Sequence, residues 1–288
     1  MQDNFIEFKQ KRELGSILTD TFKFLRQEWK HLFGSIIKIA GPALLVVLAA
    51  YVFYMYTTLG SFGDFGNPNA FDNFTVNTFL SLLILMFAAI AFYALLYGTI
   101  IHYIKSYVKN NGVVDDMEVK TGVKNRFWSL VGLSFLVAII SAIGFVLCVA
   151  PGFYLATVLI TTYSIHVLEV RSVSDSISYS FDLIKGEWWI TFATILVMFL
   201  LYYFILMIFN IPQYIYFFIK MLTMSSQASP DPSEMFDWIY ISLTAFAAVA
   251  QYMLHTVIVI CSVFIYYNLN ERKNFTGTME SIDAIGKE

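Results

Sequence analysis

The stretch WITFATILVMFLLYYFILMIFN, residues 189–210, decides the fold class of this chain. It contains no charged residue, and about 20 predominantly apolar residues are enough for a helix to cross the hydrocarbon core of a bilayer. The whole chain has the same character, since 58% of its residues are hydrophobic and 14% are charged, whereas soluble domains carry about 25% charged residues. The sequence therefore predicts an all-α integral membrane protein, with residues 1–288 forming a single membrane domain.

Apolar segments elsewhere raise the predicted number of membrane-spanning helices to about six. The fourth span, residues 153–169, is close to the lower length limit of about 17 residues. It follows Ala150-Pro151-Gly152, which predicts a tight turn out of the third span. Residues 127–169 would then form an inserted helical hairpin that either crosses fully or re-enters on one side. The predicted spans are 32–57, 79–103, 127–149, 153–169, 189–210 and 239–267.

Lysine and arginine residues fall in alternate connections, and this bias predicts the orientation. The opposite connections carry mainly acidic residues, so both termini, including the tail 271–288, are predicted to be cytoplasmic. The basic residues between the second and third spans are Lys105, Lys109, Lys120, Lys124 and Arg126. The acidic residues predicted on the other side are Asp64, Asp72, Asp231, Glu234 and Asp237.

A repeated phrase indicates an internal duplication. TFKFLRQEWKHLF at 21–33 aligns without gaps with SFDLIKGEWWITF at 180–192, at an offset of 159 residues. The same offset aligns FAAIAFYAL at 87–95 with FAAVAQYML at 246–254. An even number of crossings between the copies predicts a parallel repeat, as in some transporters. The small residues of the second aligned pair also predict close packing of spans two and six. The predicted copies are residues 12–111 and 171–270.

Each copy of the repeated phrase precedes a predicted span. Apolar residues recur there at helical spacing opposite a charged face, which predicts two amphipathic helices lying in the membrane interface. Trp29 and Trp188 suit that depth because the indole ring is itself amphipathic. Glu28 and Glu187 have two interpretations: each forms a salt bridge or cap at the bend, or the two form a paired carboxylate gate near the two-fold axis.

Polar residues within predicted spans are candidate site residues because they are costly there. Gln251 and His255 are four residues apart in the sixth span and share a face of that helix. His166 and Glu169 are three residues apart at the end of the fourth span. One interpretation is hydrogen bonding between packed helices, and the other is a polar membrane site or path through the bundle.

The sequence contains no recognisable catalytic or metal-binding motif, and it therefore predicts no enzyme, no metal and no cofactor. The chain has no metalloprotease, phosphate-loop or nucleophile-elbow motif. Asp115, Asp116 and Glu118 predict a solvated helix start rather than a metal site. Cys148 and Cys261 lie in apolar runs and are predicted to be small buried residues. The net charge of −3 provides no basic footprint for nucleic acid.

Several short motifs together resemble a bacterial family. They are Arg12, Leu14-Gly15, APGFYL at 150–155, Glu169 and SISYSFDLIKGEWW at 176–189. This combination resembles the multi-span bacterial proteins named for the glycerophosphoryl diester phosphodiesterase membrane domain. The resemblance implies a bacterial plasma (inner) membrane location and a membrane domain without a settled activity. No histidine here is followed by arginine and no Glu-x-Asp occurs, so phosphodiesterase chemistry is not transferred.

We therefore expect a non-enzymatic multi-pass membrane protein that binds lipid or organises the membrane. Its expected partners are membrane lipids, together with a second copy of itself or another membrane protein. The alternative is a carrier or permease with a substrate path between the two repeats.

Overall fold

This computed structural model describes residues 5–60, 70–225 and 236–285. Of these residues 89% are helical and none lies in a strand, which confirms the all-α prediction. Six helical segments are long and apolar enough to cross a membrane, so the chain is a membrane protein by length and composition. These segments are Leu14–Thr58, Val76–Lys109, Asp116–Leu147, Val149–Leu168, Trp188–Met224 and Trp238–Asn274.

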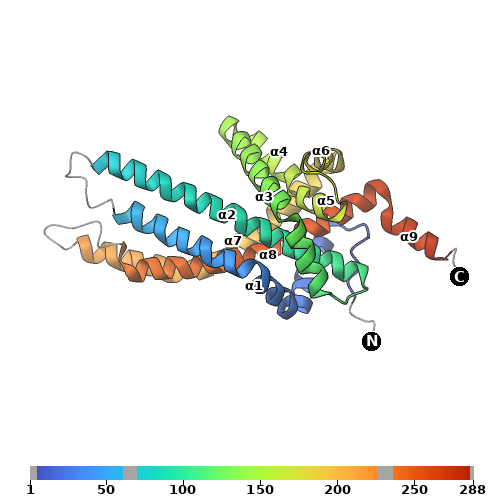
Figure 1. Ribbon diagram of the computed structural model, residues 1–288, viewed down its shortest axis with the longest axis horizontal. Helices are drawn as coiled ribbons and strands as arrows, with labels where there is room; N and C mark the ends of the chain where they lie inside the picture. Colours follow the sequence, from blue (N-terminus) through green and yellow to red (C-terminus); the bar gives the residue numbers. More distant parts are fainter. Residues whose placement is uncertain (1–4, 61–69, 226–235, 286–288) are drawn as a thin grey trace. The chain divides into compact units, whose positions relative to one another are not determined.

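The order of the helices along the chain can be followed by colour in Figure 1. The longest exceed the predicted spans at one or both ends because the helices continue past the apolar stretch into polar sequence. In order they are α1 (Leu14–Gly60), α2 (Ala70–Lys109), α3 (Asp116–Leu147), α4 (Val149–Leu159), α5 (Thr162–Leu168), α6 (Val173–Ile184), α7 (Trp188–Ser225), α8 (Trp238–Asn274) and α9 (Thr276–Ile285).

The chain divides into two compact units, and four helices contribute residues to both. Unit 1 contains Met1–Ala40, Tyr93–Leu200 and Thr256–Glu288. Unit 2 contains Gly41–Phe92 and Leu201–His255. The four shared helices are α1, α2, α7 and α8.

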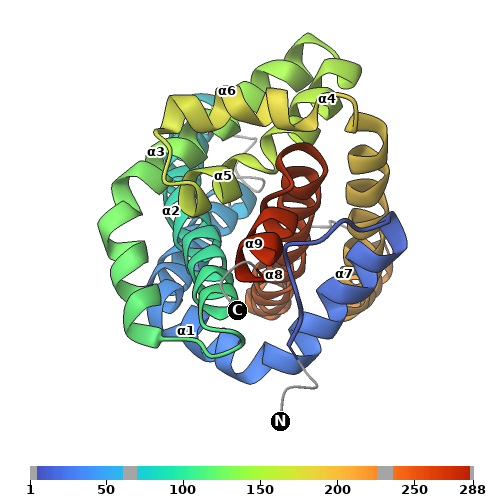
Figure 2. The same cartoon turned by 90° about the vertical axis from the view of Figure 1, so that its right-hand side faces the viewer.

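The core of unit 1 is built on the second half of α8 and an aromatic cluster. Phe264 of α8 is fully buried and stacks on Phe8 with ring centroids 4.3 Å apart. Phe24 of α1 packs edge-on against Phe8, and Tyr107 of α2 packs edge-on against Phe24. Aromatic pairs of this geometry add about 0.5–1.5 kcal/mol beyond their buried area. Figure 2 shows the N-terminal segment, to which Phe8 belongs, running beside α8 and α9.

The predicted hairpin within 127–169 is present in unit 1, but its turn comes earlier than predicted. The chain breaks at Cys148, whose extended backbone separates α3 from α4, while Pro151 lies inside the first turn of α4. Proline is tolerated there because the first N–H groups of a helix have no intrahelical acceptor. A Cβ on Gly144 would lie 3.1 Å from the Cα of Gly152, so glycine permits the close approach of the two helices. Cys148 is exposed, which contradicts the prediction, whereas Cys261 is buried as predicted.

The fourth candidate span, Val149–Leu168, is made of α4 and α5 with Ile160 and Thr161 between them. α4 ends at Leu159 and α5 begins at Thr162. At about 1.5 Å per residue α4 alone is roughly 16 Å long, about half the hydrocarbon thickness of a bilayer. Most of the Val149–Leu168 segment is buried within the protein, unlike the first three candidate spans.

The two predicted amphipathic helices differ in form. In the second copy α6 is a separate helix, capped where the Ser172 hydroxyl oxygen accepts from the Asp175 amide N–H, and it ends before Gly186, which has φ +88°. Only glycine adopts this left-handed conformation without strain. In the first copy Gln27 stands at the position equivalent to Gly186, and α1 continues without a break from the amphipathic segment into the span.

Unit 2 consists of segments of α1, α2, α7 and α8 that contact one another in pairs. Phe92 of α2 packs edge-on against Tyr252 of α8 at 5.1 Å, so spans two and six meet as predicted. Thr57 of α1 donates to Ser81 of α2 at 2.9 Å, and small polar contacts of this kind are typical between membrane helices. The outer faces of these helices carry exposed Phe, Leu, Ile and Met side chains, which suits a lipid environment.

The acidic residues predicted opposite the basic connections lie only partly within the described residues. Asp64, Asp231 and Glu234 lie outside the described residues. Asp237 accepts hydrogen bonds from Tyr216 and from Lys220, the latter at 2.9 Å. Although burial opposes ionisation, these donors lower the pKa of Asp237 to about 2.

The tail predicted for 271–288 contains the end of α8 and a further helix, α9. The carboxylate of Glu271 accepts the backbone N–H groups of Gly277 at 2.7 Å and Thr278 at 3.1 Å. These two groups are among the orphan donors at a helix start, so Glu271 acts as the N-terminal cap of α9.

Candidate functional site

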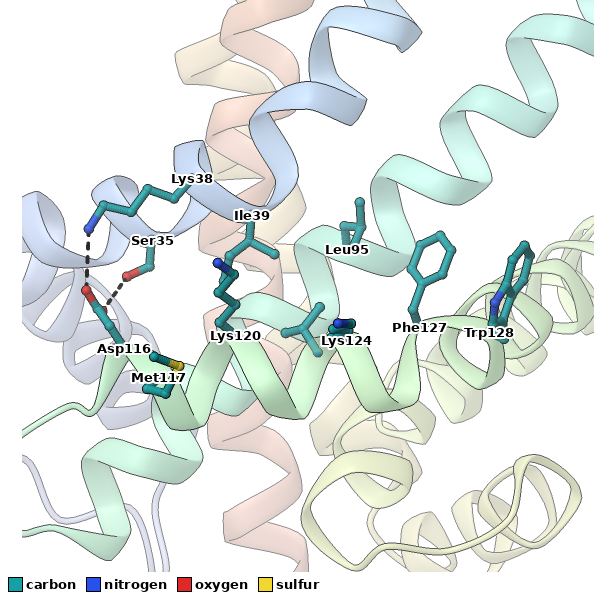
Figure 3. A pocket seen from close by; sticks show the side chains of 11 residues that line it. Ser35, Lys38, Ile39, Leu95, Asp116, Met117, Lys120, Lys124, Phe127 and Trp128 are labelled. Atoms are coloured by element: carbon teal, nitrogen blue, oxygen red, sulfur yellow. Dashed lines mark hydrogen bonds and ion pairs between the residues drawn. The ribbon is translucent and has the colours of Figure 1, made fainter.

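A cavity of about 730 Å³ lies in unit 1 where α1, α2 and α3 meet, and we call it the lysine cavity (Figure 3). Its volume falls within the range of about 300–1,000 Å³ that is usual for sites that bind small molecules. It combines three lysines and one aspartate with an apolar wall. The residues that line it are Ser35, Lys38, Ile39, Leu95, Asp116, Met117, Lys120, Val123, Lys124, Phe127 and Trp128.

The polar end of the lysine cavity is organised by the start of α3. Asp115 caps the helix, accepting from the Met117 amide at 2.8 Å and the Glu118 amide at 3.3 Å, which confirms the prediction of a helix start. The next residue, Asp116, accepts from Ser35 at 3.2 Å and faces Lys38 at 3.4 Å. Asp116 thereby fixes the first turn of α3 to α1.

The cationic side of the lysine cavity comes from one face of α3. Lys120, Lys124 and Trp128 follow at intervals of four residues, so their side chains share that face. Within the part of the chain that the structure describes, neither Lys120 nor Lys124 forms an ion pair, and both are exposed. Two ammonium groups without a carboxylate partner are therefore available to an anionic ligand at this edge.

The rest of the lysine cavity is apolar, and its aromatic residues lie farther along α3 than the two lysines. Figure 3 shows Phe127 and Trp128 on the side of α3 that faces Ile39 of α1 and Leu95 of α2. Trp128 is 80% exposed, which is unusual for a large aromatic residue unless it faces lipid or a partner. Tryptophan is enriched at the depth of lipid headgroups. The cavity thus places cations beside an apolar surface, which is the polarity pattern of a phospholipid.

Close packing of α3 on α2 holds the lysine face in place. A Cβ on Gly122 would lie 2.7 Å from Nε2 of His102, and a Cβ on Gly98 would lie 2.7 Å from Cδ1 of Leu130. His102 is buried, and its Nδ1 pairs with the carbonyl oxygen of Gly98 at 2.8 Å. The two glycines thus allow a helix separation that larger residues would prevent.

A chain of polar contacts links the repeated phrase to the lysine cavity. The hydroxyl of Tyr103 donates to Oε2 of Glu28 at 2.7 Å and pairs with Nδ1 of His31 at 2.9 Å. Nε2 of His31 lies 3.4 Å from Oδ1 of Asp116. Since Tyr103 is fully buried, this network joins α1, α2 and α3 through a side chain that has no access to water.

The two glutamates of the repeated phrase have separate partners. Glu28 accepts from Tyr103, whereas Glu187 pairs with Arg272 at 3.3 Å. Both interpretations of this glutamate pair therefore stay predictions.

The two tryptophans of the phrase differ as well. Trp29 is half exposed under the ammonium group of Lys30, and Trp188 stacks on Phe192 with centroids 5.1 Å apart. Trp29 thus lies exposed beside a lysine, whereas Trp188 also stacks on Tyr154 of α4, with centroids 5.8 Å apart.

The four predicted intramembrane polar residues divide between the units. His166 is buried in unit 1, with Nε2 2.9 Å from the Ser129 hydroxyl, and Glu169 pairs with Arg171 at 2.6 Å. Gln251 and His255 belong to unit 2, where Gln251 is exposed and His255 packs edge-on to Tyr202. Each pair therefore has its own surroundings, and the helix contacts of His166 are those of hydrogen bonding between packed helices.

The lysine cavity was not predicted as a site, although its signal was present. Lys120 and Lys124 were assigned to a connection, and the four-residue spacing that continues to Trp128 would have placed them on a helix face. Among the described residues no group of three His, Cys, Asp or Glu side chains could hold a metal ion.

Comparison with known proteins adds no family or fold relationship, because no family model, curated protein or solved structure matches this chain. The resemblance drawn from short motifs stays a prediction.

Proposed function

We propose that this chain is a non-enzymatic multi-pass membrane protein that binds an anionic phospholipid in the lysine cavity. The single observation that carries the proposal is the pair of unpaired lysines, Lys120 and Lys124, beside an apolar wall and an exposed Trp128. The phosphate would meet the ammonium groups, and the acyl chains would lie along the apolar wall.

The predicted orientation supports an anionic lipid as the ligand. The lysine-rich ends of α2 and α3 are expected on the cytoplasmic side, and both termini would lie there as well. Anionic lipids of the cytoplasmic leaflet attract basic residues by about 1 kcal/mol per Lys or Arg near the surface. In a bacterial plasma membrane, which the family resemblance implies, phosphatidylglycerol supplies this chemistry.

Native mass spectrometry from lipid nanodiscs tests the proposal. Wild-type protein in mixed phosphatidylglycerol and phosphatidylcholine nanodiscs should retain phosphatidylglycerol preferentially. The Lys120→Gln/Lys124→Gln variant should lose this preference, because removing two contacts of about 1 kcal/mol each weakens binding roughly 30-fold. A control, Lys23→Gln/Arg26→Gln, removes the same charge from exposed positions of α1 outside the cavity and should behave as wild type.

Two outcomes would contradict the proposal. If both variants lose phosphatidylglycerol equally, the lipid responds to net charge and the cavity is not its site. If wild type retains a water-soluble small molecule instead of lipid, the carrier alternative becomes the better account.

A further inference from the structure

A second cavity, of about 860 Å³, lies at the ends of α2 and α8 in unit 1, and we call it the tail cavity. It has no apolar wall comparable with that of the lysine cavity. Its lining comes from the N-terminal segment, α2 and the turn that follows it, the end of α5 and the α5–α6 connection, α6, α8 and α9. The residues are Lys9, Lys105, Val108, Lys109, Asn111, Leu168, Glu169, Arg171, Tyr179, Tyr266, Tyr267, Asn270, Asn274, Thr276 and Glu280.

The lining of the tail cavity carries an excess of positive charge. Four of its residues are cationic and two are acidic. Glu280 forms an ion pair with Lys9 and Glu169 forms one with Arg171, each with an N–O distance of 2.6 Å. Each carboxylate therefore neutralises one cation. Lys105 and Lys109 have no carboxylate partner within the lining, and Lys109 reaches outside it to Glu118 at 2.8 Å.

The environment of Lys105 is the observation that most strongly indicates an anionic ligand. Its ammonium group is partly buried and donates to the carbonyl oxygen of Val167 at 2.9 Å. Throughout residues 5–60, 70–225 and 236–285 it forms no ion pair. A carbonyl satisfies one of the three N–H donors of lysine and does not neutralise its charge. A partly buried ammonium group without a counter-ion is costly, and an anion in the cavity would remove that cost.

The backbone around the tail cavity is held in an unusual conformation. Three non-glycine residues of the described chain have positive φ: Asn111 at 51°, Val170 at 59° and Phe275 at 53°. Asn111 lines the cavity, and the other two are chain neighbours of Arg171 and Thr276, which also line it. Residues such as Val and Phe adopt this region at a cost of about 1–3 kcal/mol, and such strain clusters at ligand sites.

We propose that the tail cavity binds a small, water-soluble anion that carries a phosphate group. The phosphate would be held by Lys105 and Lys109, while the tyrosine rings and asparagine amides of the lining would contact the remainder of the molecule. The volume exceeds that of phosphate alone and suits a phosphorylated metabolite. Glu280 of α9 forms an ion pair with Lys9 in the lining. The Glu280 carboxylate would therefore compete with the anionic ligand for Lys9. This inference is independent of lipid binding in the lysine cavity.

The proposal is tested by titrating inorganic pyrophosphate into full-length protein. The protein is held in nanodiscs of phosphatidylcholine alone, and the ionic strength is kept constant. Microscale thermophoresis should show saturable binding to wild type. Lys105→Gln should bind about tenfold more weakly, since a charge-assisted contact is lost. Glu280→Gln should bind several-fold more tightly, because a competing carboxylate is removed. The two changes have opposite signs, which a purely structural role of the cavity would not produce.

Three controls make the result decisive. Lys120→Gln/Lys124→Gln, in the lysine cavity, should leave pyrophosphate binding unchanged. Lys109→Gln replaces Lys105→Gln if the latter fails to fold, because Lys109 is largely exposed. Nanodiscs containing phosphatidylglycerol distinguish the source of the phosphate, since competition by that lipid would assign the cavity to a lipid headgroup instead of a soluble anion. Absence of saturable binding, or equal binding by wild type, Lys105→Gln and Lys109→Gln, would overturn the proposal.

Discussion

Replacing Gly122 by alanine should separate α3 from α2 and destabilise the frame of the lysine cavity. A Cβ there would lie 2.7 Å from Nε2 of His102, whereas ordinary contacts begin near about 3.5 Å, so the ring must retreat by about 1 Å. The ring is buried and tied to Gly98 by a 2.8 Å hydrogen bond, so it cannot retreat without breaking that bond. Overpacking costs about 1–3 kcal/mol and the lost hydrogen bond about 1 kcal/mol.

The matched control lies in the same helix. Gly132 has no atom within 4 Å of its would-be Cβ, so Gly132→Ala should gain up to about 1 kcal/mol from helix propensity alone. Both variants share that gain. The free energy of unfolding of Gly122→Ala should therefore be about 2–4 kcal/mol lower than that of Gly132→Ala. In a His102→Ala background the obstruction is absent, and Gly122→Ala should then behave like Gly132→Ala.

Equilibrium unfolding in detergent micelles measures these differences in stability. Sodium dodecyl sulfate is the denaturant, and circular dichroism reports the loss of helix. Equal stability of Gly122→Ala and Gly132→Ala would refute the reasoning. So would a Gly122→Ala penalty that persists after His102 is removed, because the close contact would then not be its cause.

Three further predictions follow from particular contacts. Tyr103→Phe removes the 2.7 Å hydrogen bond to the Glu28 carboxylate and should cost about 1.5–3 kcal/mol in the same unfolding assay. The pKa of Asp237 is lowered to about 2, so its contribution to stability is present above its unfolded value near 4 and is lost as pH falls toward 2. The melting temperature of Asp237→Asn should therefore lie below that of wild type at pH 6, and the gap should close as pH falls below 4. A single cysteine at Lys23, in a cysteine-free background, should react with a membrane-impermeant thiol reagent in opened but not intact cells, because the N-terminal segment is predicted to be cytoplasmic.

Each of these has a distinct contrary outcome. Unchanged unfolding of Tyr103→Phe would mean that its hydrogen bond to Glu28 makes no net contribution to stability. A gap for Asp237→Asn that is constant between pH 6 and pH 2.5 would mean that its contacts do not depend on ionisation. Labelling at Lys23 in intact cells would reverse the predicted topology, and with it the leaflet assigned to the lysine cavity.

The six candidate spans could be predicted because membrane insertion depends on local composition. A run such as 189–210 has no charged residue, and no tertiary contact is needed to recognise it. The interval between α4 and α5 within the fourth span could not be predicted in this way, because hydropathy does not report where a helix is interrupted. The start of α9 likewise depends on a carboxylate from α8, Glu271, that caps it across the connection.

The duplication remains a prediction, and the structure shows why sequence identity alone does not define the copies. Gly186 ends α6 with a left-handed backbone, whereas Gln27 at the matching position permits an uninterrupted α1. Glu28 and Glu187 match in sequence, yet one accepts from a tyrosine and the other pairs with an arginine. Matching side chains at one offset can therefore coexist with local geometry that has diverged.

Both candidate sites occupy helix ends that lie beyond the apolar stretches. A search for spans by hydropathy ends the second span at 103 and begins the third at 127, and it assigns everything between to a connection. The helices instead continue to Lys109 and begin at Asp116, because polar turns remain helical once they are capped and paired, as Asp115 and Glu118 are. Those added turns carry four of the lysines on which the two proposals depend. In this chain the residues of both candidate sites therefore lie where a helix continues beyond its apolar stretch. The end of such a helix is set by capping and tertiary contacts, which hydropathy does not report.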